Sequence, residues 1–320
     1  KEDCEKVFDV FRKYSVHYFF YIGGNDSAET ADIINNIARE RSYELRVFHV
    51  PKTIDNDLRV TDHCPGYGSA ARYVACCFAG NDLDNRALPG VKIDIVMGRH
   101  AGWLTAASAL ARIDETCGPH LIYMPEKPIS LEKMSDDIAK VYEKHGRCLV
   151  ACSEGVTGPD GKLLIESEIT EKDSHGNVQL SGSGALGDFI AGAVKNALKE
   201  KYPNIRIRTD TLGYAQRSFV GTYSDVDANE ARMVGEAAVK YAMKGDIDGS
   251  VAINRFPGDE YVVEPMLAKL KDVARVTKDL PEEYINAEGN NVTQEFIDYI
   301  TPIVGELPEI GLLEQKTYKK

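Results

Sequence analysis

Short apolar runs alternate with longer amphipathic stretches along most of the chain. The runs are rich in Val, Ile, Phe and Tyr, which favours strands, and the stretches that follow carry apolar residues at helical spacing. In residues 27–41, the positions of Ala31, Ile34 and Ala38 predict one buried helical face, with Ser27 as the N-cap. The pattern predicts strands at 16–22, 45–50, 91–97, 120–124, 147–152, 205–212 and 250–256, and helices at 1–14, 27–41, 66–78, 103–112, 130–145, 181–198, 227–244 and 292–304.

This alternation of strands and helices sets the fold class. Repeated strand–helix units imply a mostly parallel sheet with helices on both faces. The 320 residues are enough to form two such units, each with its own core. The sequence therefore predicts an α/β protein of two doubly wound, mostly parallel-sheet lobes that face a shared cleft.

Composition and charge exclude several classes of partner. The chain has 38 Lys and Arg against 50 Asp and Glu, a net charge of −12 at pH 7. Nucleic acids and anionic membranes are bound by basic faces, so we expect neither as a partner. No apolar run approaches the ~20 residues that a membrane-spanning helix needs. Seven cysteines without a C-x-x-C pair favour reduced thiols and a cytoplasmic location.

Polar turns rich in charge or glycine follow several predicted strands. The richest is Pro-Lys-Thr-Ile-Asp-Asn-Asp at 51–57, which holds two carboxylates and an ammonium directly after the strand at 45–50. Similar turns are Gly-Gly-Asn-Asp-Ser at 23–27, Met-Gly-Arg at 97–99 and Ser-Glu-Gly at 153–155. Because ligands bind at the carboxyl ends of the strands in open α/β sheets, we expect these turns to line a site.

Each turn taken alone has a plainer explanation. Gly23 and Gly24 fit a phosphate cradle at a helix N-terminus, but also an ordinary tight turn. Arg99 fits a phosphate clamp or a solvated surface arginine. Arg206 and Arg208 share one strand face, which suits either an anion site or a solvated edge strand. Function is favoured because nearly all of these turns fall at strand carboxyl ends.

Taken together, the turns resemble those of the 6-phosphofructokinase family, and within it the pyrophosphate-dependent enzymes. The three turns at 23–27, 51–57 and 97–99 and Gly-Tyr-Ala-Gln-Arg at 213–217 match in the family's order, and Ser-Glu-Gly fits as well. The resemblance covers essentially the whole chain from about Ser15. The family's first strand and glycine-rich loop have no counterpart here, so we expect that an N-terminal piece is missing from this sequence.

The resemblance implies roles for the central turn. Asp55 would be the general base that takes the proton from the C1 hydroxyl of fructose 6-phosphate as that oxygen attacks a phosphoryl group. Lys52 would compensate charge on pyrophosphate or on the transferring group. Asn25 and Asp57 would lie near Mg²⁺, the implied cofactor. The family commonly has Asp where this chain has Asn25, so this position offers an oxygen without a charge.

The resemblance also implies pyrophosphate as the phosphoryl donor. ATP-using members generally have glycine at the position of Asp26, where a carboxylate would crowd and repel the rest of a nucleotide. A plainer explanation is that a carboxylate simply favours the first turn of a helix. The implied pyrophosphate-binding residues are Gly24, Asp26, Ser27 and Lys52.

A further set of residues is implied for the sugar phosphate. Arg208 and Arg217 suit the 6-phosphate, and Glu154 suits the sugar hydroxyls. Arg99 suits the charge that develops on the transferred phosphoryl group. The implied substrate-binding residues are Thr53, Asp55, Met97, Gly98, Arg99, Glu154, Arg208, Tyr214 and Arg217, and the implied catalytic residues are Asp55, Lys52 and Arg99.

The resemblance implies a division of the chain and a way of assembling it. A phosphoryl-donor lobe would comprise residues 1–67 and about 216–263, and a sugar-phosphate lobe about 68–215 and 264–320. In this family an arginine can cross from a neighbouring subunit, so we expect a homodimer or a larger homo-oligomer. The implied reaction gives fructose 1,6-bisphosphate and phosphate, and we expect it to be reversible.

Three alternatives remain open at this point. The first is an ATP-dependent 6-phosphofructokinase, against which Asp26 argues. The second is a non-catalytic regulatory subunit of the same fold, against which the intact Asp55 argues. The third is a generic nucleotide-binding module or a dehydrogenase, and no G-x-G-x-x-G sequence follows any predicted strand.

Overall fold

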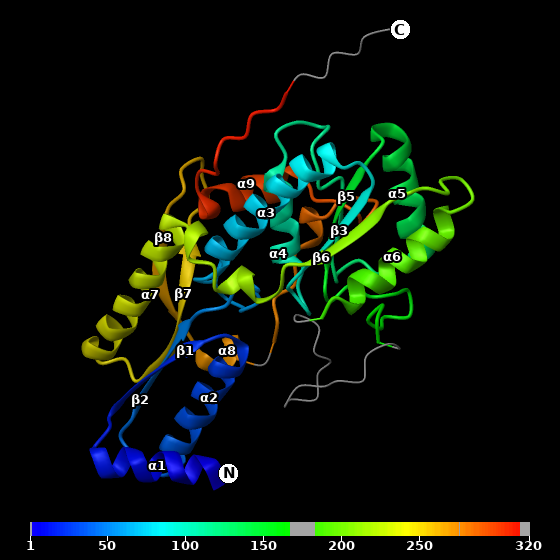
Figure 1. Cartoon of the computed structure of the whole chain (residues 1–320). Coiled ribbons are helices and arrows are strands. Elements are labelled where there is room, and N and C mark those ends of the chain that lie inside the picture. The colour runs from blue at the N-terminus through cyan, green and yellow to red at the C-terminus, as the bar shows by residue number, and fades with distance from the viewer. Residues whose placement is uncertain (1, 167–182, 275, 314–320) are drawn as a thin grey trace.

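A computed structural model describes residues 2–166, 183–274 and 276–313, which form two four-stranded sheets with their helices (Figure 1). The strands are β1 (Tyr18–Gly23), β2 (Arg46–Pro51), β3 (Val91–Val96), β4 (Leu121–Tyr123), β5 (Cys148–Ser153), β6 (Ile207–Thr211), β7 (Asp248–Arg255) and β8 (Val263–Ala268). The first sheet has the order β1–β2–β7–β8 and the second the order β4–β5–β3–β6. Every pairing is parallel except that of β7 with β8.

Helices cover both faces of each sheet. In β2, Val47 packs with α1 and α2, whereas the next residue, Phe48, packs with α7. In β3, Ile95 packs with α5 and α6, whereas Val96 packs with α3. The α/β fold predicted from the sequence is therefore confirmed. The helices are α1 (Glu2–Tyr14), α2 (Asn25–Glu40), α3 (Tyr67–Ala87), α4 (Trp103–Ala106), α5 (Leu131–His145), α6 (Ala185–Leu198), α7 (Asp225–Lys244), α8 (Leu270–Val273) and α9 (Gln294–Val304), with short 3-10 helices η1 (Ala107–Ala111), η2 (Gly213–Arg217), η3 (Val220–Thr222) and η4 (Glu282–Tyr284).

Helices α2 and α3 differ in their bounds from the predicted helices. Helix α2 begins at Asn25, and its N-cap is Gly24, which makes no side-chain capping bond. The prediction of Ser27 as N-cap is wrong because the chain enters the helix directly after the glycine pair. Helix α3 continues to Ala87, beyond the predicted end at residue 78. The helix predicted at residues 181–198 begins at residues 181 and 182, which lie outside the described part of the chain.

The last strand of the first sheet was not predicted. Strand β8 pairs along β7 from Ser250 opposite Ala268 to Arg255 opposite Val263. Its sequence contains Pro265, which interrupts a strand pattern but is tolerated on an edge strand. Helix α8 follows and packs on α2, so residues 263–273 lie with the first sheet. The first sheet and its helices thus include residues beyond 263, and the division of the chain into lobes stays a prediction.

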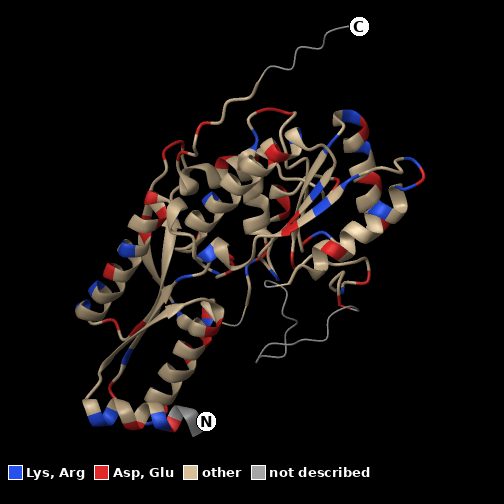
Figure 2. Cartoon of the chain, in the orientation of Figure 1, with Lys and Arg blue, Asp and Glu red and all other residues tan. Residues whose placement is uncertain are grey.

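The charged side chains are spread over the helices. Along α7, acidic residues gather towards the N-terminal end and basic residues towards the C-terminal end, which suits the helix dipole (Figure 2). None of the helices in the described part of the chain has the length and apolar character needed to cross a membrane.

Candidate active site

Residues 51–57, here called the catalytic turn, follow β2 and are held by hydrogen bonds on both sides. The Thr53 N–H donates to the Pro65 carbonyl (N···O 3.1 Å), and the Asp55 N–H donates to the Thr53 hydroxyl (3.1 Å). Asn56 has a φ of +54°, and its side-chain oxygen accepts from the Cys64 N–H (3.0 Å). Asn tolerates this left-handed conformation better than most residues do. The turn therefore presents Asp55 in a fixed direction.

The Asp55 carboxyl lies in a strongly perturbing environment. Burial, followed by the carboxylates of Asp57 and Glu154, raises the pKa of Asp55 from 3.8 to about 7. Lys52 and Arg217 act on this pKa in the opposite direction. These four charged residues come from both lobes, and all of them were predicted for the site. A carboxylate with a pKa near neutrality is well matched to general-base catalysis.

Asn25 and Asp57 face each other across the turns that follow β1 and β2. The Asn25 amide group donates to Asp57 Oδ2, and the Thr53 hydroxyl approaches Asp57 Oδ1 (3.4 Å). Burial raises the pKa of Asp57. The remaining Asn25 oxygen, Oδ1, is buried without a hydrogen-bond partner. An orphaned amide oxygen beside a carboxylate fits Mg²⁺, which takes few protein oxygens and keeps several waters.

The predicted pyrophosphate residues gather at the first two turns of the first sheet. The Lys52 N–H donates to the Gly23 carbonyl (3.0 Å), which joins the two turns. Gly24 lies against Thr53, and a Cβ on Gly24 would lie 3.6 Å from the Thr53 Cβ. Asp26 is exposed in the first turn of α2, and the Lys52 side chain is also exposed. The structure thus brings a cation and the free end of a helix to one place.

In the second sheet, hydrogen bonds join the Met-Gly-Arg turn to the Ser-Glu-Gly turn. Gly98 has a φ of +133°, which favours glycine, and its N–H donates to Glu154 Oε1 (3.4 Å). The Ser153 hydroxyl donates to the Gly98 carbonyl (2.6 Å). A Cβ on Gly155 would lie 1.9 Å from the Arg99 carbonyl oxygen, so only glycine fits there. Glu154 and Arg99 therefore have fixed backbone positions next to each other.

The turn that follows β6 joins this arrangement through a buried glutamine. Gln216, in η2, accepts the Met97 N–H with its side-chain oxygen (3.1 Å). The Arg217 guanidinium lies over the Tyr214 ring, 4.7 Å from its centroid. The position of Tyr214 limits the orientations that Arg217 can adopt.

A cavity of about 490 Å³ lies between the two lobes at these turns. Lys52, Thr53 and Asp55, which follow β2, line one side of it, and Met97 and Arg217, which follow β3 and β6, also line it. A volume of this size fits a small phosphorylated ligand. The structure therefore brings predicted donor-site, base and sugar-site residues to one cavity.

Arg208 is not among the residues brought together. It is the second residue of β6 and pairs with Lys92 at the amino end of β3, whereas the other site residues follow strand carboxyl ends. Its guanidinium donates to Asp84 Oδ2 (2.8 Å) and to the Leu88 carbonyl (2.9 Å) at the end of α3. Arg208 therefore does not lie at the carboxyl end of its strand, which continues three residues further.

Two residues that shape the cavity were not assigned a role from the sequence. Gln216 was part of a recognised motif but had no assigned role. Asp227, in α7, accepts the N–H groups of Gly66 (2.7 Å) and Ser69 (3.0 Å) and so caps the amino end of α3, which walls the cavity. No local pattern could reveal this contact, because it joins residues far apart in the chain.

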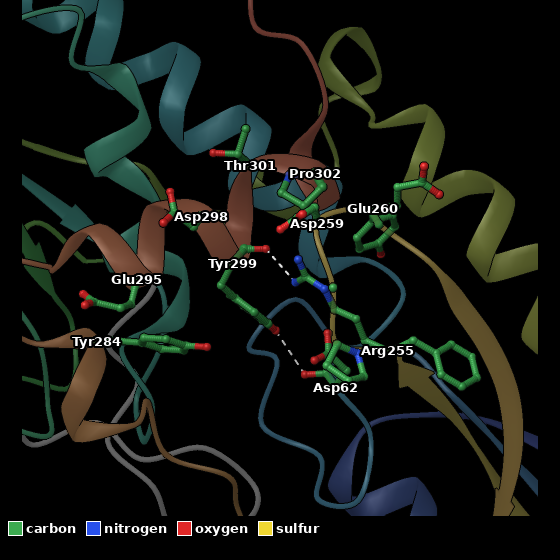
Figure 3. A pocket seen from close by; sticks show the side chains of 14 residues that line it. Asp62, Arg255, Asp259, Glu260, Tyr284, Glu295, Asp298, Tyr299, Thr301 and Pro302 are labelled. Atoms are coloured by element: carbon green, nitrogen blue, oxygen red, sulfur yellow. Dashed lines mark hydrogen bonds between the residues drawn. The ribbon is translucent and has the colours of Figure 1, made fainter.

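A second cavity, of about 800 Å³, lies between the end of β7 and α9 (Figure 3). Arg255 crosses it, donates to the Tyr299 carbonyl (2.9 Å) and lies 4.9 Å from the centroid of the Tyr261 ring. The Tyr299 hydroxyl points to the Asp62 carbonyl. None of the predicted site residues lines this cavity.

Two open-sheet lobes with phosphate-type turns meeting at one cavity define a phosphotransferase of the phosphofructokinase type. The phosphofructokinase family profile matches residues 1–242, and the chain belongs to this family. The chain is 51% identical over 304 residues to the pyrophosphate–fructose 6-phosphate 1-phosphotransferase of Rhodospirillum rubrum, which covers 94% of this chain and 74% of that protein. The enzyme of the same name from Halomonas elongata is 35% identical over 304 residues, covering 94% of this chain and 70% of that protein.

A solved structure agrees with this assignment. The pyrophosphate-dependent phosphofructokinase from Marinobacter aquaeolei aligns with a TM-score of 0.81 at 32% identity. The alignment covers 99% of this chain and 79% of that chain. The fold predicted from the alternation of strands and helices and the family predicted from the five turns are therefore confirmed.

Proposed function

We propose that this chain transfers a phosphoryl group from pyrophosphate to the C1 hydroxyl of fructose 6-phosphate, which gives fructose 1,6-bisphosphate and phosphate. The observation that carries the proposal is the cavity where Asp55, with a pKa of about 7, lies among Lys52 and Arg217. The names of the similar proteins support this choice of donor and acceptor.

Asp55 is the general base of the proposed reaction. It takes the proton of the C1 hydroxyl while the hydroxyl oxygen bonds to the terminal phosphorus atom, and the bridging P–O bond of pyrophosphate breaks to release phosphate. Lys52 and Arg99 balance the charge on the transferring group. A moderately basic carboxylate is sufficient, since phosphoryl transfer depends mainly on positioning and charge neutralisation.

Mg²⁺ is the proposed cofactor. Asn25 and Asp57 would hold it through oxygen atoms, with water completing the shell. When bound, the ion would neutralise charge on the pyrophosphate oxygens. The buried, unpartnered Asn25 Oδ1 supports this assignment.

Pyrophosphate, rather than ATP, is the proposed donor because of Asp26. Its exposed carboxylate stands in the first turn of α2, beside the turns that carry Gly24 and Lys52. The α-phosphate of a bound nucleotide would lie beside the negative charge of Asp26 and be repelled by it, whereas pyrophosphate would end before it reached this carboxylate. Gly24, Ser27 and Lys52 bind the donor in this account.

The proposed sugar site uses residues that follow strands of the second sheet, together with Thr53, which follows a strand of the first. Arg217 binds the 6-phosphate, Glu154 the sugar hydroxyls, and Thr53, Met97, Gly98 and Tyr214 complete the surface around the sugar. Arg208, which is tied to Asp84 away from the cavity, would serve a neighbouring subunit's pocket in a homodimer or a larger homo-oligomer. The enzyme would work reversibly in the cytoplasm, in keeping with its free thiols at six described cysteines.

The test compares pyrophosphate and ATP as donors in parallel initial-rate assays with fructose 6-phosphate, Mg²⁺ and the full-length protein. The proposal predicts turnover with pyrophosphate and none with ATP. Turnover with ATP alone would keep Asp55 as the base and refute the role of Asp26. Turnover with neither donor would favour a regulatory subunit of the same fold.

A further inference from the structure

Residues 277–280 contact the catalytic turn and the residue that follows it. Thr277 forms an antiparallel bridge with Leu58, and the Lys278 N–H donates to the Asp57 carbonyl (2.7 Å). The backbone of this segment is therefore bonded to the residue that follows Asn56 in the turn. Neither Thr277 nor Lys278 lines the cavity of the candidate active site.

The Lys278 ammonium holds the chain that continues from the catalytic turn. It donates to the carbonyl oxygens of Thr61 (3.1 Å) and Asp62 (2.7 Å). The Asp62 carbonyl also accepts the Tyr299 hydroxyl (3.0 Å), as Figure 3 shows from the side of the second cavity. The Lys278 backbone thus contacts the catalytic turn at Asp57, and the Lys278 side chain contacts Thr61 and Asp62, which follow the turn.

The same lysine is bonded to the second lobe. The Trp103 indole N–H donates to the Lys278 carbonyl (3.1 Å), and the Lys278 ammonium lies 4.9 Å from the centroid of the indole ring. The Leu280 N–H donates to Glu126 Oε1 (2.9 Å), which also accepts the Gly102 N–H (2.8 Å). Gly102 and Trp103 lie just after the Met-Gly-Arg turn, so the segment connects the two halves of the site.

These contacts lead us to propose that Lys278 is a positioning residue for phosphoryl transfer. It sets the catalytic turn, with Asp55 and Asp57, at a fixed distance from the Met-Gly-Arg turn that carries Arg99. The inference rests on the proposed function, because that function is what gives the catalytic turn its role in phosphoryl transfer. Lys278 acts through the turn, and a displacement of reacting groups by about 1 Å lowers a rate by about 10²-fold.

The test replaces the ammonium while the backbone bonds of residue 278 stay. Lys278→Met should lower kcat with pyrophosphate by about 10²-fold, while the KM values for fructose 6-phosphate and pyrophosphate change less than about 3-fold. Lys278→Arg, which keeps a cation that can donate to both carbonyls, should recover part of the loss. Lys278→Gln removes the charge but keeps an uncharged N–H donor group, and it serves as the second variant if the Met variant does not fold.

The matched control is Lys127→Met, which removes another lysine next to Glu126. Its ammonium pairs with the exposed Glu282 (2.9 Å), outside both cavities, and its loss should leave kcat unchanged. Circular dichroism and urea unfolding check that each variant is folded. A wild-type kcat in a folded Lys278→Met or Lys278→Gln variant overturns the positioning role, as does an equal loss in Lys127→Met. A wild-type protein that shows no turnover overturns the proposed function instead, and the positioning role with it.

Discussion

Replacing the Asp55 carboxyl should stabilise the protein and disable it at the same time. Burial, followed by the carboxylates of Asp57 and Glu154, raises the pKa of Asp55 from 3.8 to about 7 in the folded chain, and this costs stability. A folded-state pKa above the unfolded value means that the folded protein binds more protons between these two pH values. Its stability therefore falls as pH rises from about 4 to about 7, and stays low above that. Asp55→Asn removes this cost.

The magnitude follows from the shift. About three pKa units correspond to about 4 kcal/mol at most, at about 1.4 kcal/mol per unit. Asp55 is only partly buried and faces a cavity, so solvent screens part of this and we expect a gain of about 2 kcal/mol. Asparagine is close in size to a protonated aspartic acid, so the variant should match the wild type in stability near pH 4.

The assay is urea unfolding of both proteins at equal concentration, at several pH values between about 4 and about 8.5. The free energy of unfolding of Asp55→Asn should exceed that of the wild type by an amount that grows up to about pH 7. Asp114→Asn is the control of opposite sign, because hydrogen bonds from Thr116 lower the pKa of this exposed carboxyl. An Asp55→Asn variant that is less stable than the wild type at high pH would refute the reasoning.

The other predictions concern donor choice, the sugar site and a buried histidine. Asp26→Gly should permit some turnover with ATP, and a complete absence of ATP use, even combined with a change of Lys52, would leave the steric account incomplete. Gln216→Leu leaves the Met97 N–H without its acceptor and the Gly213 carbonyl without its side-chain donor, so it should lower the free energy of unfolding measured in urea by about 1–3 kcal/mol, and an unchanged free energy would contradict this. Burial opposes the charge of His63, but hydrogen bonds to two carboxylates outweigh it and raise its pKa, so this pairing stabilises the protein below about pH 6.5 and is lost as pH rises through the folded pKa. His63→Gln should therefore destabilise most at low pH, and a loss that is the same at all pH values would contradict this.

The sequence identified the turns of the site because their residue types and their places after strands are local features. Asp55, Lys52 and Glu154 follow apolar strands, and parallel strands bring their carboxyl ends to one edge of a sheet. The identity of the phosphotransferase family then followed from the order of the turns. This part of the site depends on short stretches of chain and was predictable.

What the sequence could not show are contacts between distant segments. Asp227 caps α3 across about 160 residues, and Lys278 reaches the catalytic turn across more than 200. A lone lysine in a polar stretch carries no local signal of burial, because the same pattern also describes a solvated loop. Strand β8 was missed for a related reason, since Pro265 obscures the alternation expected of a strand.

Arg208 shows the limit of reasoning by strand position. Alternation correctly predicts its strand, but it does not predict which end of β6 the residue occupies. The pairing of Lys92 with Arg208 fixes it at the amino end, where Asp84 is within reach. The register of parallel strands is set by packing over the whole sheet, which a single sequence does not reveal.

The central claim, that Asp55 drives phosphoryl transfer from pyrophosphate to fructose 6-phosphate, is tested most directly by following the phosphorus signals with ³¹P NMR. Full-length wild-type protein and Asp55→Asn are each mixed with pyrophosphate, fructose 6-phosphate and Mg²⁺. We predict that the wild type forms fructose 1,6-bisphosphate and phosphate in equal amounts as pyrophosphate disappears. The variant should be slower by about 10²- to 10⁴-fold while it still binds fructose 6-phosphate. Hydrolysis of pyrophosphate without sugar bisphosphate, or equal rates for the two proteins, would contradict the account.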